Sequence, residues 1–358
     1  MKGSSLRVGF VPLTDCAPLV MAQELGLFRK FNLRVRLERE LGWATVRDKM
    51  IYGELDAAHA LAAMAASATL GLGSIATDCL TALVLNQNGN AITLSKELWE
   101  RGVRDGHTLR EEIKRTRNEK ILTFGVVFPF SSHRHLLRKW LSAHGIDSER
   151  DVRMVVVPPP QMAVNLKTGN LDGFCVGEPW NSVAVQSRLG RCVATSAELD
   201  SGHPEKILLV RREFAEQRSE EHVALVAALL EACEFCAEPE NFDHIAETLA
   251  QPEFVGVPAE ILRPGLSGDF DFGGKEIRGI PDFCLFHGVG VNEPSYDKAA
   301  WTLELVRSSG LCQCSAELNF TLGKRIFRPD IFDQAIQLIR ETQIQTSHEI
   351  ETKKELSL

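Results

Sequence analysis

The fold is decided by residues 158–180, which read PPPQMAVNLKTGNLDGFCVGEPW. After the three prolines, residues 161–167 have the spacing of a short amphipathic helix, and Phe174 begins an apolar strand. Gly169 ends that helix, because glycine readily adopts the left-handed backbone of a helix stop. The strand breaks at Gly177-Glu178-Pro179-Trp180, and such strand ends are where α/β proteins usually hold their ligands.

The same pattern also occurs earlier in the chain. Residues 51–57 read IYGELDA and residues 167–173 read KTGNLDG, so each runs from a helix through a glycine to Leu, Asp and a strand. Glycine stops the helix, leucine covers its end, and aspartate starts the strand. This repetition of a structural unit predicts two similar α/β lobes.

Length and composition agree with two lobes of a globular protein. The chain has 358 residues, more than one hydrophobic core normally serves, with 44% hydrophobic and 25% charged residues. Its net charge of −8 argues against nucleic acid as the main partner, because phosphate binding needs a basic surface.

The N-terminal residues and the cysteines predict a cytoplasmic protein. The chain enters a strand pattern at Leu6 with no apolar signal core before it, and no run reaches the roughly 18 to 20 apolar residues of a membrane span. Nine cysteines fit a reducing compartment. Cys233 and Cys236 lie in a helical pattern, where we expect small buried hydrophobes rather than a metal or redox pair.

Strand and helix patterns divide the chain between the lobes. We predict that residues 1–100 and 205–342 form lobe one, that residues 101–204 form lobe two, and that residues 343–358 are a charged tail. A single solvated helix is predicted within residues 96–118. The Gly- and Phe-rich residues 266–290 show no pattern that we can assign.

Five motifs carry a resemblance to a known family. They are Gly42-Trp43-Ala44, LNQNGNAI at 85–92, PPPQM at 158–162, DGFCVGEPW at 172–180 and HPEK at 203–206. With them the chain resembles, from residue 6 to about residue 337, the nitrate- and bicarbonate-binding branch of the type II periplasmic-binding-protein superfamily. The resemblance implies a two-lobe α/β clamshell with an oxyanion held in the cleft between the lobes.

The resemblance implies binding rather than catalysis. Transport members are exported, so the missing export signal favours a cytoplasmic nitrate or nitrite sensor that releases an antiterminator protein when the anion binds. The alternative is the solute-binding component of a nitrate or bicarbonate ABC transporter, or a detached domain of a transporter ATPase. A clamshell-fold enzyme has less support, because no nucleophile elbow, phosphate loop or zinc spacing occurs.

A nitrate site needs several hydrogen-bond donors in one plane and a cationic group. The resemblance implies cleft positions for Trp43, His133, Val176, Glu178 and Lys206, and side-chain chemistry adds amide donors. We expect the ligand-binding residues to be Trp43, Gly89, Asn90, His133, Pro160, Gln161, Val176, Glu178 and Lys206, with Gln87 an alternative to Asn90. Each also has a plain structural interpretation, since Trp43 suits a core, His133 the start of a helix that Ser131 or Ser132 would cap, and Lys206 the surface.

Glu178 does not fit an anion site unless its charge is compensated. A carboxylate repels an anion, so we expect Glu178 to pair with Lys206. If the ligand is bicarbonate, as in some relatives, Glu178 could instead help to hold calcium. Otherwise we expect no cofactor and no metal, and a nitrate or nitrite ligand.

Overall fold

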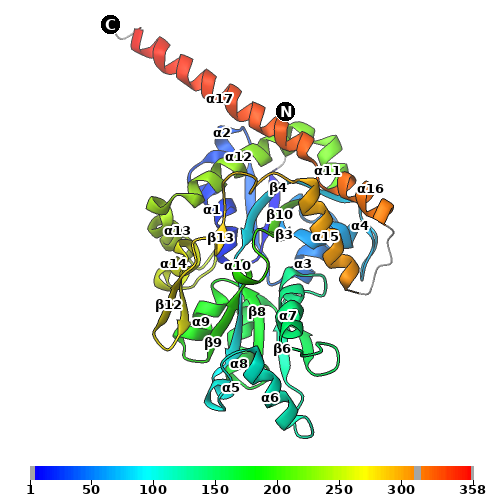
Figure 1. Ribbon diagram of the computed structural model, residues 1–358. Helices are drawn as coiled ribbons and strands as arrows, with labels where there is room; N and C mark the ends of the chain where they lie inside the picture. The colour runs from blue at the N-terminus through cyan, green and yellow to red at the C-terminus, as the bar shows by residue number, and fades with distance from the viewer. Residues whose placement is uncertain (1–4, 310–315, 356–358) are drawn as a thin grey trace.

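The computed structural model describes residues 5–309 and 316–355, and it has two lobes, each built on a β-sheet (Figure 1). Sheet A has the strand order β13-β4-β10-β3-β1-β2 and sheet B the order β7-β6-β8-β5-β9. The predicted two-lobe α/β architecture is confirmed. The strands of sheet A are β1 (Leu6–Phe10), β2 (Val35–Arg39), β3 (Ala57–Leu61), β4 (Cys79–Asn88), β10 (Pro204–Arg211) and β13 (Cys284–Leu285). Those of sheet B are β5 (Asn90–Ser95), β6 (Thr123–Val126), β7 (Arg153–Val156), β8 (Gly173–Gly177) and β9 (Gly190–Thr195).

Helices cover both sheets. Around sheet A lie η1 (Thr14–Cys16), α1 (Ala17–Glu24), α2 (Leu27–Lys30), α3 (Trp43–Ile51), α4 (Ala62–Thr69), α11 (Arg212–Gln217), α12 (Ser219–Ala237), η3 (Pro239–Asn241), α13 (Phe242–Leu249), α14 (Ala259–Ser267), α15 (Tyr296–Ser308), α16 (Ala316–Ile326) and α17 (Pro329–Glu355). Around sheet B lie α5 (Lys96–Glu100), α6 (Gly106–Thr116), α7 (Ser132–Ala143), η2 (Pro159–Gln161), α8 (Met162–Lys167), α9 (Trp180–Gln186) and α10 (Ser196–Leu199). The single helix predicted within residues 96–118 is thus two helices, because Asp105 caps the second one.

The chain crosses between the lobes at Gly89 and again just before Pro204. Gly89 has a φ of 95°, a left-handed conformation that suits glycine, and β5 after it already belongs to sheet B. Lobe two, predicted to begin at residue 101, therefore begins eleven residues earlier, because β5 begins at Asn90 and 101 − 90 = 11. The two crossings are tied together, since the Gly202 N–H donates to Asn88 Oδ1 at 3.0 Å.

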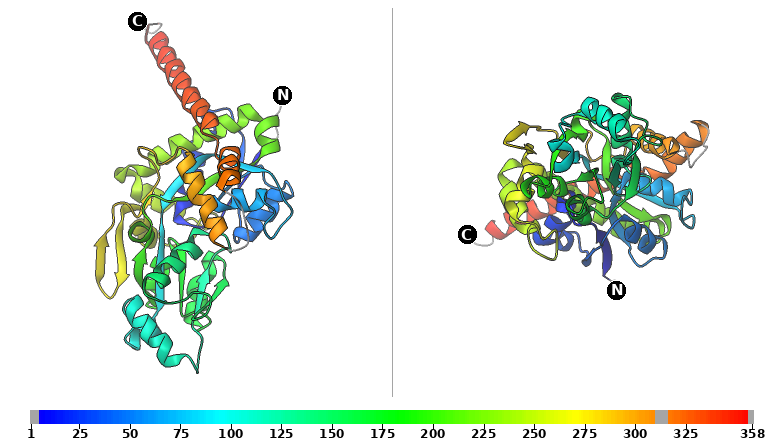
Figure 2. Two further views of the ribbon diagram at one scale, coloured as in Figure 1. Left: turned by 45° about the vertical axis from the view of Figure 1, so that its right-hand side comes forward. Right: turned by 90° about the horizontal axis from the view of Figure 1, so that it is seen from below.

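A hairpin that follows lobe one in the chain packs against lobe two. Strands β11 (Asp269–Gly273) and β12 (Glu276–Gly279) lie in the segment without predicted structure, and they extend beside lobe two (Figure 2). Phe270 stacks on Phe283 with ring centroids 4.5 Å apart, and both rings pack in one cluster with Val185 and Cys192 of lobe two. Part of the segment predicted for lobe one thus covers lobe two, because its aromatic side chains are buried there.

The last helix, α17, continues into the residues predicted to be a charged tail. It begins against α12, where Ile331, Phe332 and Ala335 are buried, and it extends away from lobe one as far as Glu355 (Figure 1). Within the described residues no helix combines the length and apolar character that a bilayer crossing requires.

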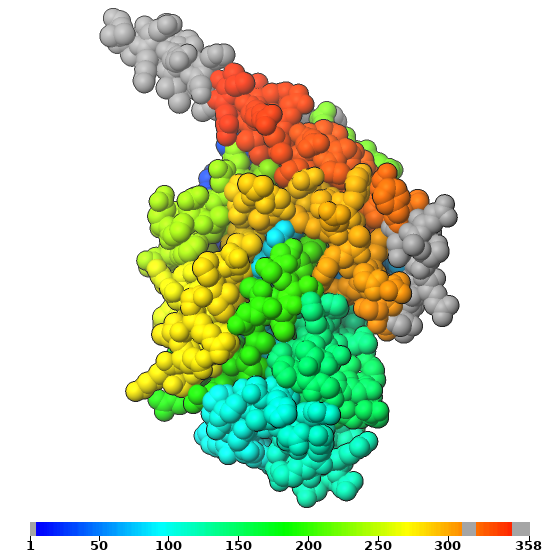
Figure 3. Space-filling model, in the orientation of Figure 1, coloured from blue at the N-terminus to red at the C-terminus, as the bar shows by residue number. Residues whose placement is uncertain are grey.

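The two lobes touch along a rim between α7 of lobe two and α15 of lobe one (Figure 3). Asp200, at the end of α10, accepts a hydrogen bond from Trp301 Nε1 at 3.1 Å and pairs with Lys139 Nζ at the same distance. Arg138 Nη1 donates to the backbone oxygen of Ser308 at 2.9 Å. These contacts hold the lobes together at the surface.

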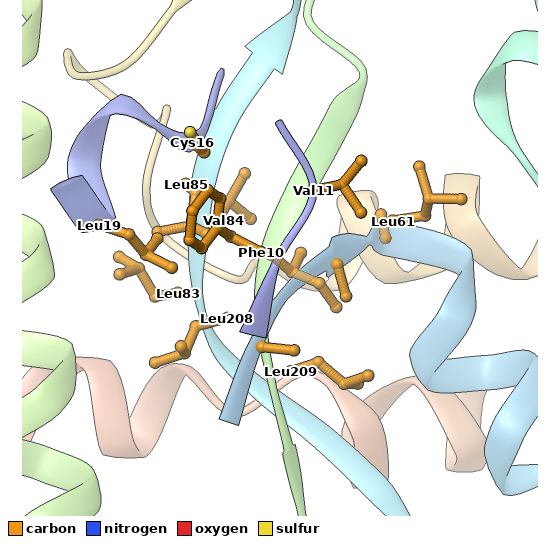
Figure 4. Packing of buried hydrophobic residues seen from close by; sticks show 14 of the residues in the cluster. Phe10, Val11, Cys16, Leu19, Leu61, Leu83, Val84, Leu85, Leu208 and Leu209 are labelled. Carbon is orange, nitrogen blue, oxygen red and sulfur yellow. The ribbon is translucent and has the colours of Figure 1, made fainter. Parts of the chain in front are cut away.

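The core of lobe one is built from the strands of sheet A. Phe10 of β1, Val84 of β4 and Leu208 of β10 are almost fully buried and lie in one cluster (Figure 4). Every residue of β4 is buried, which explains why its sequence is a nearly continuous apolar run rather than an alternating one. This rigid sheet positions the strand ends that face lobe two.

Candidate functional site

A buried cluster of charged side chains lies where the strand ends of lobe one meet the crossings. Lys206 on β10 places Nζ 2.7 Å from Asp15 Oδ2 and 2.8 Å from Glu205 Oε1. Burial alone would lower the pKa of Lys206, but attraction to the two carboxylates outweighs it and raises that pKa. Burial likewise acts to raise the pKa of Asp15 and Glu205, and attraction to Lys206 reverses this, so both carboxylates are ionised.

Histidine rings and an amide complete the cluster. His59 Nε2 lies 3.0 Å from Asp15 Oδ1, and His203 Nε2 lies 3.1 Å from Glu205 Oε2. Asn90 Nδ2 donates to the same Glu205 oxygen at 2.7 Å, which links the start of lobe two to β10. The carboxylates therefore accept from several donors, as buried charges must.

Trp43 and His133 bring ring nitrogens into the cluster without a partner. The Trp43 ring lies 5.4 Å from Lys206 Nζ, and its Nε1–H has no acceptor among the described residues. His133 Nε2 is 3.8 Å from Glu205 Oε1, too far for a hydrogen bond, and has no other partner among those residues. Both side chains are essentially inaccessible to water, and a buried polar group without a partner costs about 1–3 kcal/mol. Each of these nitrogens is thus available to an acceptor that the described residues do not supply.

The position of His133 follows from the start of α7. Ser131 caps this helix, as the sequence predicted for Ser131 or Ser132, and its Oγ accepts from the Arg134 N–H at 3.2 Å. His133 thus lies in the first turn, where helix N–H groups favour negative charge. Burial lowers the pKa of His133 to about 4, so its imidazole is neutral at neutral pH.

The predicted pairing of Glu178 with Lys206 is wrong. Lys206 is occupied by Asp15 and Glu205, whereas Glu178 Oε2 accepts from the Ser182 N–H at 3.3 Å in the first turn of α9. The carboxylate turns to this helix start because free N–H groups there attract negative charge. Burial raises the pKa of Glu178 to about 7. Within residues 5–309 and 316–355, no group of three or more His, Cys, Asp or Glu side chains is arranged to hold a metal.

The remaining predicted residues divide between the wall of the cluster and the surface. The backbone N–H of Glu178 donates to the Gly89 oxygen at 3.3 Å, and Val176 is buried beside it in β8. Pro160 is half-buried. Gln161 is exposed at the end of η2, so the structure does not bring its amide into the cluster. Gln87 directs its amide to the carbonyls of Gly290 and Val291 instead.

Sequence reasoning missed four members of the cluster, namely Asp15, His59, His203 and Glu205. Asp15 lies in η1, five residues after the last residue of β1, and loops after strand ends are typical ligand positions. His59 is a polar residue inside an otherwise apolar strand, AAHAL. The sequence positions of Asp15 and His59 could therefore have identified both residues as site candidates. His203 and Glu205 were noted only as parts of a motif.

The chain is similar to known proteins over most of its length. Residues 2–250 match the NMT1-like family. The chain belongs to the NMT1-like family. The nitrate/nitrite binding protein NrtA of Synechococcus elongatus is 33% identical over 97% of this NMT1-like chain and 80% of NrtA. The structure of the periplasmic nitrate-binding protein NrtA from Synechocystis PCC 6803 superposes with a TM-score of 0.89 at 28% identity, covering 94% of this chain and 89% of that one.

Two longer relatives match with higher identity. The nitrate import ATP-binding protein NrtC of Synechocystis sp. is 40% identical over 96% of this NMT1-like chain but only 52% of NrtC. The bicarbonate transport ATP-binding protein CmpC of Synechococcus elongatus is 39% identical over 84% of this chain and 44% of CmpC. The chain therefore spans about half the length of these curated relatives. The match to NrtA, in contrast, covers most of both chains, and NrtA is named as a nitrate/nitrite binding protein.

Proposed function

We propose that this NMT1-like chain is the nitrate- or nitrite-binding part of a transport system. The observation that carries the proposal is the pair of buried ring nitrogens, Trp43 Nε1 and His133 Nε2, that lack partners around the ammonium of Lys206. Nitrate is planar, and its oxygens only accept hydrogen bonds. It therefore suits a site in which buried N–H donors have no acceptor among the described residues. The same proposal assigns Asn90, Gly89, Val176 and Pro160 to the wall of the site.

The relatives support a transport role more than the predicted sensor role. NrtA and NrtC carry nitrate in their names, and NrtC is named as an import component. This favours the alternative that we set beside the sensor, namely a binding component of an ABC transporter. Release of an antiterminator partner and a cytoplasmic location stay predictions. A pull-down with and without nitrate tests the partner directly.

Bicarbonate is the second candidate ligand, and one observation favours it. Asn90 donates through Nδ2 to Glu205, which leaves its Oδ1 buried with no partner among the described residues. Bicarbonate carries a hydroxyl that such an acceptor could bind, whereas nitrate does not. CmpC, named for bicarbonate transport, is also among the similar proteins.

Calorimetric titration of the purified protein decides between these ligands. Nitrate, nitrite and bicarbonate are each titrated with and without calcium, and we expect heat from nitrate or nitrite that is independent of calcium. Heat from bicarbonate alone would refute the choice of nitrate. His133→Gln should weaken binding, whereas His222→Gln is the matched control, because His222 is also buried with unpartnered ring nitrogens but lies on α12 beside Phe214.

A further inference from the structure

The charges of the buried cluster can be counted from its hydrogen bonds. His203 Nδ1 lies 2.7 Å from the backbone oxygen of Asp200, and its Nε2 lies 3.1 Å from Glu205 Oε2. Both of these oxygens are acceptors, and Glu205 also accepts from Asn90 and Lys206. Lys206 supplies one ammonium against the two carboxylates of Asp15 and Glu205, so these three side chains together carry one excess negative charge.

His59 and His133 are neutral. His59 donates through Nε2 to Asp15, while its Nδ1 has no partner among the described residues, and burial lowers its pKa. His133 is neutral because burial lowers its pKa as well. A monovalent anion that enters this buried cluster would add a further negative charge to two carboxylates that already share Lys206. Such a charge is costly in a protein interior, and titratable neighbours usually change their protonation to remove it.

We propose that the site binds its anion together with one proton, which is held on the imidazole of His133. The inference deepens the proposed function and rests on it. His133 Nε2 lacks a partner and lies 3.8 Å from Glu205 Oε1, so an imidazolium there would face both that carboxylate and the anion. Nitrate brings no proton of its own, so the proton comes from solvent.

The groups that face His133 come from several elements. Glu205 and Lys206 belong to β10, Asp15 to η1 and His203 to the crossing, while Ser132 Oγ lies 3.4 Å from Nδ1 on the same helix. The carboxylates favour the imidazolium, whereas the ammonium of Lys206 and the start of α7 oppose it. In the ligand-free site these effects and burial leave His133 neutral, and the charge of the anion reverses the balance.

His59 is a less suitable proton acceptor. A proton on its Nδ1 would create a donor with no acceptor among the described residues, on a ring that packs 5.6 Å from the Trp43 ring. Glu178 is the other competitor, because its carboxyl is buried and its Oε1 has no partner there. Its carboxylate accepts at the start of α9, from Ser182.

The sign of the resulting pH dependence is fixed. The anion raises the pKa of His133, so the added affinity is present at low pH and is lost as pH rises through the pKa of the complex. Between the two pKa values, affinity should fall about tenfold for each unit of pH, with an uptake of about one proton per anion.

Calorimetry in two buffers measures this uptake directly. Nitrate is titrated in phosphate and in Tris, which have different heats of ionisation, from about pH 5 to about pH 8. The difference in heat gives the protons taken up, and we expect the uptake to vanish in His133→Gln and to persist in His59→Gln, Glu178→Gln and the control His222→Gln.

Three results would overturn the proposal. Wild-type binding without proton uptake at any pH would reject the coupling and leave the proposed function intact. Proton uptake that persists in His133→Gln but vanishes in Glu178→Gln would show that Glu178, and not His133, takes up the proton. Absence of binding by nitrate, nitrite and bicarbonate would reject the proposed function and the coupling with it. The wild-type measurement needs no variant, so poor folding of His133→Gln would not prevent a decision.

Discussion

Replacing Lys206 with methionine should destabilise the fold as well as weaken anion binding. The ammonium is fully buried between Asp15 and Glu205, so its removal leaves two buried carboxylates without their cation. Loss of one partner from a buried ion pair costs about 3–5 kcal/mol. Because native proteins are stable by about 5–15 kcal/mol, we expect a folded but markedly weakened variant at neutral pH.

The difference between wild type and Lys206→Met should depend on pH with a definite sign. Lys206 holds the pKa of Asp15 and Glu205 below their usual values. Stability from a lowered carboxyl pKa is present above the unfolded value, about 4, and is lost as pH falls through the folded value. The wild type therefore loses its advantage in acid, and the two unfolding free energies should approach each other.

Urea unfolding followed by circular dichroism checks this expectation. Lys49→Met is the matched control, because Lys49 pairs with Glu40 at 2.7 Å at a partly exposed site, and such surface pairs contribute about 0–1 kcal/mol. Equal stability of Lys206→Met and wild type at neutral pH, or a difference that does not shrink in acid, would refute the charge arrangement described above. Unchanged nitrate affinity in the folded variant would remove Lys206 from the site.

Three further substitutions test other parts of the structure. Trp43→Phe should keep the buried ring but lose the free N–H, so nitrate affinity should fall about tenfold in calorimetry, and unchanged affinity would exclude the indole as a donor. Asp200→Asn should loosen the rim between Trp301 and Lys139, and an unchanged radius of gyration in X-ray scattering would argue against that role. Gly89→Ala should lower stability by about 1–2 kcal/mol in urea, because φ is 95°.

The features that the sequence predicted correctly are local ones. The cap at Ser131 depends on a few neighbouring residues, and the two-lobe organisation follows from repeated helix, glycine and strand patterns. The crossing at Gly89 was placed too late because a single residue separates β4 from β5, and in sequence this resembles a turn within one sheet. The hairpin was missed because Phe270 is buried by lobe two, which lies far away in the chain.

In the site, too, contacts between residues that are remote in the sequence could not be predicted. Trp43, His133 and Lys206 came from a family resemblance, and the structure brings them together. The partner of Glu178 could not be predicted, because charge pairing depends on distances between residues that are remote in sequence. Asp15 lies 191 residues before Lys206, since 206 − 15 = 191, and only the folded sheet makes them neighbours.

The central position of β10 in sheet A has a consequence for synthesis of the chain. This strand lies between β3 and β4, yet the ribosome makes it after all five strands of sheet B. Sheet B is contiguous from Asn90 to Thr195, so lobe two can close while lobe one still lacks its middle strand. We expect proteolysis of nascent chains to find lobe two protected first, with lobe one following once residue 211 has left the exit tunnel.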